Sequence, residues 1–143
     1  MGSSDTMLKV SIIGSGKWSY ALSKILTNVN ILVKARDIKK AQKIFHENDQ
    51  ISITKSFSDL TNCDLIFLAN PSQTVRQNLE ILKSKSTKLN SKFVICCKGV
   101  EKKTNKLVSQ VIEEFFPENE FAVLSGPNFS SEVIRGLPTA SVL

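Results

Sequence analysis

Two glycines separated by one residue, Gly14 and Gly16, stand where an apolar strand gives way to an amphipathic helix. The run 10–13 predicts a buried strand, and apolar residues from Trp18 onward recur at the spacing of one helix face. A glycine turn in this position lets the backbone approach a pyrophosphate, and the N–H groups at the helix start point toward its negative charge. The third glycine of the usual fingerprint is absent, so a tight turn that uses glycine only for positive φ is the alternative interpretation.

Cationic residues follow the second predicted strand, at 31–35. An NAD-specific site places a carboxylate there for the ribose 2′-hydroxyl, whereas this chain has Arg36, with Lys34 close by. An arginine pairs instead with the 2′-phosphate of NADP, so we expect NADP(H) at least to be tolerated. The alternative is that Arg36 is a solvated charge beside Asp37, which can cap the next helix.

Lys98 follows a further predicted strand, at 93–97, and precedes Gly99. We expect its ammonium to emerge at the carboxyl end of that strand, where it would bind a phosphate or polarise a carbonyl oxygen. A surface lysine at a strand end is the other interpretation, and the adjacent glycine favours the functional one because it lets a ligand approach the backbone.

Predicted strands alternate with predicted helices along the chain. Strands are expected at 10–13, 31–35, 51–53, 64–69, 93–97, 121–124 and, beginning, at 139–143, and helices include one at about 104–115. This alternation predicts an α/β fold with a Rossmann-like, doubly wound, mainly parallel sheet. Ligands bind such sheets at the carboxyl ends of the strands, and the glycine turn, Arg36, Asn70-Pro71, Lys98-Gly99 and the stretch 125–128 all fall there.

Length and composition set broad limits. The 143 residues predict one domain, over 7–143, with residues 1–6 left out as a flexible lead. We expect a cytoplasmic protein, since no membrane span or signal peptide is recognisable. The net charge of +6 favours anionic partners. The lysine cluster at 83–92 contains no interleaved aromatic residue, so we expect a solvated connection rather than a nucleic-acid patch. A membrane is not expected as a partner either.

No metal site is expected. The odd number of cysteines includes the adjacent Cys96 and Cys97, which would point to opposite faces of a strand and remain reduced, and the one histidine, His46, lies in a polar stretch. The carboxylates Glu101 and Glu132 have no partner at a readable spacing, so they are assigned no catalytic role.

Four blocks of sequence together resemble a known family. They are Ile12–Leu22 (IIGSGKWSYAL), Cys97–Glu101 (CKGVE), Leu124–Phe129 (LSGPNF) and Arg135–Ala140 (RGLPTA). The chain resembles the N-terminal domain of bacterial NAD(P)-dependent sn-glycerol-3-phosphate dehydrogenase. The resemblance implies interconversion of dihydroxyacetone phosphate and sn-glycerol 3-phosphate for phospholipid synthesis, with NAD(P)H as cofactor and a homodimer as the full-length enzyme.

The resemblance also implies roles for individual residues. Cofactor contacts would come from Gly14, Ser15, Gly16, Lys17, Trp18, Arg36, Lys98 and Ser130, and substrate contacts from Lys98, Gly126 and Asn128.

The sequence departs from the family in two ways. Ser19 stands where the family usually has a glycine, so the first helix and strand are expected to pack less closely. The family continues into a helical C-terminal domain with the catalytic lysine, so we expect these 143 residues to bind cofactor without turnover. Reduction of dihydroxyacetone phosphate by the chain would contradict this.

Other classes remain open at this stage. One is a related dehydrogenase acting on a 3-hydroxyacid or another phosphorylated metabolite, and another is a non-enzymatic nucleotide-binding or nucleic-acid-binding module. A methyltransferase would place an acidic residue at the end of the second strand, and Arg36 argues against that.

Overall fold

The computed structural model describes residues 7–46, 49–86, 88–97 and 99–124. Within them, a six-stranded sheet has the order β3-β2-β1-β4-β5-β8, and every pair in it is parallel. The strands are β1 (Leu8–Ile13), β2 (Val29–Lys34), β3 (Ile51–Thr54), β4 (Leu65–Leu68), β5 (Lys92–Ile95) and β8 (Phe121–Val123). The order reverses direction between β1 and β4, which makes this the switch point of a Rossmann-like sheet and confirms the predicted fold class.

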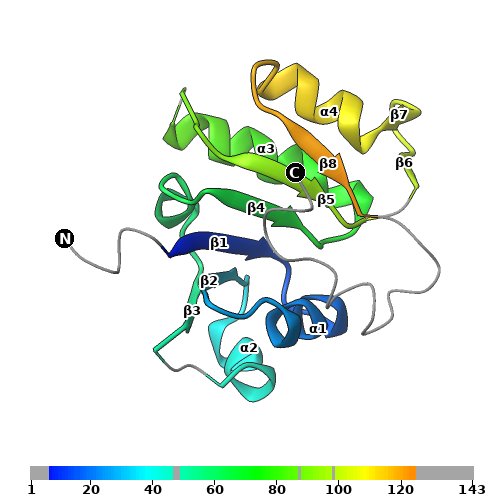
Figure 1. The fold of residues 1–143 in the computed structure, drawn as a ribbon. Coiled ribbons are helices and arrows are strands. Elements are labelled where there is room, and N and C mark those ends of the chain that lie inside the picture. The colour runs from blue at the N-terminus through cyan, green and yellow to red at the C-terminus, as the bar shows by residue number, and fades with distance from the viewer. Residues whose placement is uncertain (1–6, 47–48, 87, 98, 125–143) are drawn as a thin grey trace.

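Helices cover both faces of the sheet (Figure 1). The helices α1 (Lys17–Ile25) and α2 (Ile38–Ile44) pack on one face, and α3 (Ser72–Lys85) and α4 (Val108–Phe115) pack on the other, joined there by the short 3₁₀ helix η2 (Phe57–Leu60). Because strands buried on both faces need apolar side chains throughout, β4 is fully buried, with Ile66 and Leu68 on the α3 side and Leu65 and Phe67 on the α1 side.

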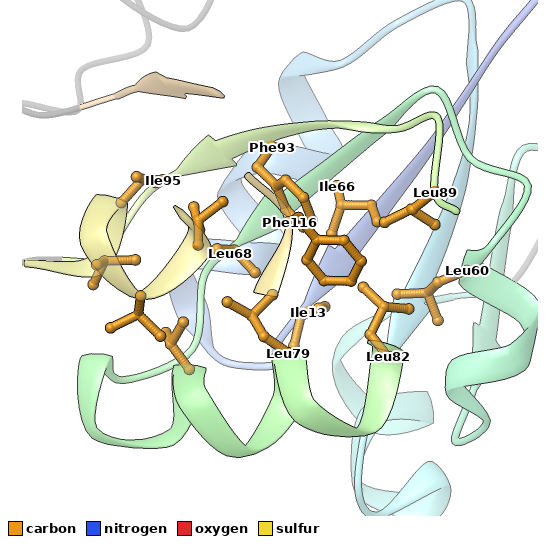
Figure 2. Close-up of a cluster of buried hydrophobic side chains, with 14 of the residues drawn as sticks. Ile13, Leu60, Ile66, Leu68, Leu79, Leu82, Leu89, Phe93, Ile95 and Phe116 are labelled. Atoms are coloured by element: carbon orange, nitrogen blue, oxygen red, sulfur yellow. The ribbon is translucent and has the colours of Figure 1, made fainter. Parts of the chain in front are cut away.

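Figure 2 shows how the α3 face is packed. Leu79 and Leu82 project from α3 toward the sheet, and Phe93 of β5 meets Phe116 at the end of α4, with ring centroids 5.4 Å apart. All four side chains are almost completely buried, and each contributes about 1.5–3 kcal/mol relative to exposure. This packing fixes the sheet and so the positions of the strand ends.

The predicted helix at 104–115 begins later than expected. Two short antiparallel strands, β6 (Val100–Glu101) and β7 (Lys106–Leu107), precede α4. Asn105 adopts a left-handed conformation (φ 61°) and donates its N–H to Glu101 O at 2.7 Å, which closes the turn between the strands. The prediction was wrong here because a left-handed residue ends any helix that would include it.

The cysteines behave as predicted from their adjacency. Cys63, Cys96 and Cys97 form no disulfide. Cys96 and Cys97 follow β5 directly, and Cys96 joins the core on the α1 face whereas Cys97 packs against the core on the α3 face. Burial raises the pKa of the Cys96 thiol to about 12, so this group stays protonated and acts as a small apolar side chain.

Candidate functional site at the carboxyl edge of the sheet

The turn after β1 lies at the switch point, against the end of β4. Gly14 N donates to Lys34 O at 3.1 Å, and Ala69 N donates to Ile13 O at 3.0 Å, so three strand ends are tied together. Gly14 has φ +118°, and a Cβ on it would lie 3.0 Å from the Ala69 carbonyl oxygen. Both the backbone conformation and the close approach of β4 therefore require a glycine here.

Gly16 serves a different purpose from Gly14. It is the N-cap of α1 and makes no side-chain capping bond, and a Cβ on it would meet no atom within 4 Å. The first turn of α1 carries no acidic residue, and Lys17 and Trp18 are exposed on it. Because a helix N-terminus carries positive partial charge, this end of α1 is suited to receive an anion.

Two cations lie at the end of β2. The Lys34 side chain is buried, with Nζ 4.3 Å from the centre of the Phe57 ring, and Arg36 is exposed two residues later. Burial, reinforced by the nearby Arg36 charge, lowers the pKa of Lys34. Asp37 accepts a hydrogen bond from Lys40 N at 3.1 Å and so caps α2, as predicted. The end of β2 thus offers positive charge at the same edge as the glycine turn.

The ends of β4 and β5 complete the described edge. Pro71 is the N-cap of α3. Asn70 is buried and donates Nδ2–H to Thr74 Oγ1 at 2.7 Å. Gly99 has φ +89°, and a Cβ built on it would lie 3.9 Å from Ser72 Oγ, so the segment after β5 runs beside the start of α3.

The structure gathers part of the predicted site. Gly14, Ser15, Gly16, Lys17 and Trp18 form one continuous turn and helix start, and Arg36 lies on the neighbouring strand end. Lys98, Gly126, Asn128 and Ser130 lie outside the described residues, as do the expected strand at 139–143 and the acidic Glu132.

Two further findings concern the described residues only. They contain no group of three or more His, Cys, Asp or Glu side chains arranged to hold a metal ion. None of the helices described has the length and apolar character needed to cross a membrane.

The sequence did not reveal the partner of Glu101. This carboxylate is buried and accepts hydrogen bonds from Arg76 Nε at 2.9 and 3.1 Å and from Thr104 Oγ1 at 2.5 Å. Hydrogen bonding to Arg76 is the main cause that lowers the pKa of Glu101. Arg76 lies 25 residues away on α3, and no local spacing rule connects the two positions.

Residues 9–143 match the model of a protein family described as the NAD-dependent glycerol-3-phosphate dehydrogenase N-terminus. The chain belongs to this family. It is 34% identical over 146 residues to glycerol-3-phosphate dehydrogenase [NAD(P)+] of Wolbachia pipientis from Culex pipiens, covering 94% of this chain and 45% of the relative. The enzyme of the same name from Caulobacter vibrioides is 36% identical over 152 residues, with 96% and 46% covered. The chain therefore spans about half the length of the curated relatives it matches.

Solved structures of glycerol-3-phosphate dehydrogenases share the fold. The Plasmodium falciparum protein superposes with a TM-score of 0.71 at 25% identity, covering 93% of this chain and 44% of that one. The Coxiella burnetii protein gives 0.72 at 20% identity, with 92% and 45% covered. The family model confirms the family predicted from the four sequence blocks, and the solved structures show that the described sheet has the same fold.

Proposed function

We propose that this chain forms the dinucleotide-binding part of an NAD(P)-dependent glycerol-3-phosphate dehydrogenase. The enzyme would act in the cytoplasm, interconverting dihydroxyacetone phosphate and sn-glycerol 3-phosphate for phospholipid synthesis. The observation that carries the cofactor part is the glycine turn at the switch point between β1 and β4, leading into a helix whose N-terminus has no side-chain cap. The substrate part rests on the family.

The described residues have separate tasks in this proposal. The turn Gly14–Gly16 receives the pyrophosphate, and the exposed Lys17 and Trp18 flank it. Arg36 binds the adenosine ribose, where its guanidinium can form a paired interaction with a 2′-phosphate. The bound nicotinamide would supply or accept the hydride, and the protein contributes placement and charge.

The remaining roles rest on the sequence resemblance. Lys98 would contact both the cofactor and the substrate, and Ser130 would contact the cofactor. Gly126 and Asn128 would contact the phosphorylated substrate. Dimerisation of the full enzyme is proposed on the same basis.

Titration of the purified chain with NADPH and NADH, followed by the fluorescence of the reduced nicotinamide, tests the cofactor part. We expect Arg36→Ala to weaken NADPH binding by roughly 10- to 100-fold, because the charge-assisted hydrogen bonding to the 2′-phosphate is lost, with a much smaller effect on NADH. Lys39→Ala is the matched control, because Lys39 is an exposed cation on α2. Failure to bind either dinucleotide, combined with steeply salt-dependent binding of a DNA oligomer, would favour a nucleic-acid-binding module.

The substrate part is tested with a full-length enzyme that contains this chain. We expect NAD(P)H oxidation with dihydroxyacetone phosphate in preference to a panel of 3-oxoacids. The opposite preference would identify a 3-hydroxyacid dehydrogenase and leave the cofactor proposal intact.

A further inference from the structure

The backbone that follows Gly99 is attached to the first turns of α3 by side chains. Gln73 Nε2 donates to Val100 O at 2.9 Å, and Gln73 Oε1 accepts from Lys102 N at 3.0 Å. One side-chain amide thus pairs with the backbone on both sides of Glu101. These two hydrogen bonds fix the position of the segment Gly99–Lys102 along the axis of α3.

Arg76, one helical turn after Gln73, holds the residue between those two contacts. Its Nε donates to both carboxylate oxygens of Glu101, while its terminal nitrogens donate to the two oxygens of Glu114 on α4, at 2.7 and 2.9 Å. The pair with Glu101 faces inward, since that side chain is 5% exposed, whereas the Glu114 side chain is 32% exposed. A single guanidinium therefore has a buried arm and an outer arm.

Stability alone gives a poor account of the buried arm. Burying a carboxylate costs several kcal/mol of desolvation, and well-packed apolar residues commonly hold two segments together as well or better. What the charged contact adds is a defined position for Glu101, because Arg76 Nε shares its one N–H between the two carboxylate oxygens and Thr104 Oγ1 donates to one of them. Together with the two bonds from Gln73, this contact sets the geometry between two partners. Here the partners are the start of α3, which follows β4, and β6, which follows β5.

We propose that Glu101, held by Arg76 and Gln73, is a positioning residue for the dinucleotide site. It sets the backbone of Gly99–Lys102 relative to α3, and so fixes the spacing between the loops that leave β4 and β5 at the carboxyl edge. The proposal rests on the proposed function for the ligand it names, a nicotinamide dinucleotide. The geometric part concerns the protein alone.

Glu101→Ala and Glu114→Ala form a matched pair, because both remove a carboxylate from the same guanidinium. We expect both variants to unfold more readily than the wild type. Only Glu101→Ala should speed amide hydrogen exchange at Lys102 and Asn105, whose N–H groups bond to Gln73 and to Glu101 O. Only Glu101→Ala should weaken NADPH binding, by about tenfold, the lower end of what losing an outer-shell partner costs at metal sites.

Glu101→Gln adds a conservative variant that keeps an acceptor for Arg76 Nε, and it replaces Glu101→Ala if that protein does not fold. We expect it to restore most of the exchange protection and of the NADPH affinity. Equal NADPH affinity and equal exchange in the Glu101 and Glu114 variants would overturn the positioning role. If the wild type binds no dinucleotide, the proposed function fails, and the exchange data alone decide whether Glu101 positions this segment.

Discussion

Ser19 and Ser23 lie one turn apart on α1 and differ in what their hydroxyls reach. Both are buried, but Ser23 Oγ donates to Tyr20 O at 2.7 Å, whereas Ser19 Oγ has no hydrogen-bond partner among the described atoms. A buried hydroxyl without a partner costs about 1–3 kcal/mol. Ser19 therefore carries this cost in the first turns of the helix that follows the glycine turn.

We therefore predict that Ser19→Ala raises the free energy of unfolding by about 1 kcal/mol, since it removes the unpaired hydroxyl and improves helix propensity. Ser23→Ala is the control and should lower stability, because it deletes a hydrogen bond that is made. Urea unfolding of the three proteins measures both effects. A less stable Ser19→Ala protein would show that this hydroxyl contributes to the fold.

Substitutions at the two glycines of the turn are predicted to have different effects. Gly14→Ala should lower the free energy of unfolding by about 1–3 kcal/mol, because alanine is strained at φ +118° and its Cβ would meet the Ala69 carbonyl. Gly16→Ser should leave stability unchanged or higher, since serine is a favoured N-cap and a Cβ fits there. Its hydroxyl would compete with the cofactor pyrophosphate for the helix N–H groups and weaken NADPH binding.

Thermal unfolding and NADPH titration of the same two variants separate these outcomes. The assignment of roles would be wrong if Gly14→Ala unfolded like the wild type, or if Gly16→Ser bound NADPH with unchanged affinity. The two results are independent of each other, because one concerns the contact with β4 and the other the open end of α1.

At the scale of elements, the sequence predicts the features that depend on residues close together in the chain, such as strand bounds and helix caps. The apolar runs and helical spacings placed all six sheet strands within about two residues of their observed bounds, and Asp37 was recognised as a cap because capping is local. Strands β6 and β7 were missed, since two-residue strands leave no periodic pattern. The burial of Lys34 was missed because the ring that covers it comes from Phe57 on η2, which is distant in the sequence.

In the candidate site, too, residues that follow local patterns were predicted and contacts between distant residues were not. Gly14–Trp18 and Arg36 were found because each follows a recognisable strand, and a parallel sheet brings strand ends to one edge. The contacts that hold the edge together were not predictable. Arg76 meets Glu114 because α3 and α4 pack side by side on one face of the sheet (Figure 1), and it meets Glu101 because β6 also lies against α3. Both placements depend on the whole core.

At the scale of the whole molecule, these ion pairs make stability depend on pH. Hydrogen bonds from Arg76 and, next in size, from Lys106 hold the pKa of Glu114 at about 2, and hydrogen bonds from Arg76 and Thr104 hold the pKa of Glu101 below its ordinary value of 4.5. Because both pKa values are lower in the folded protein than in the unfolded chain, the unfolded chain takes up protons first as pH falls. The stabilisation is therefore complete above about pH 5 and is lost progressively as pH falls toward about 2.

Comparison with Arg76→Met isolates this contribution from other acid effects, including the repulsion that grows as the net charge rises above +6. Methionine keeps much of the apolar stem but cannot lower either carboxyl pKa. We predict that the wild type exceeds the variant in free energy of unfolding by a constant amount above about pH 5, and that this gap narrows as pH falls from about 5 toward about 2. Urea unfolding at a series of pH values measures this difference in free energy of unfolding. A difference that stayed constant below about pH 5 would mean that Arg76 stabilises the protein through packing rather than through the ionised carboxylates.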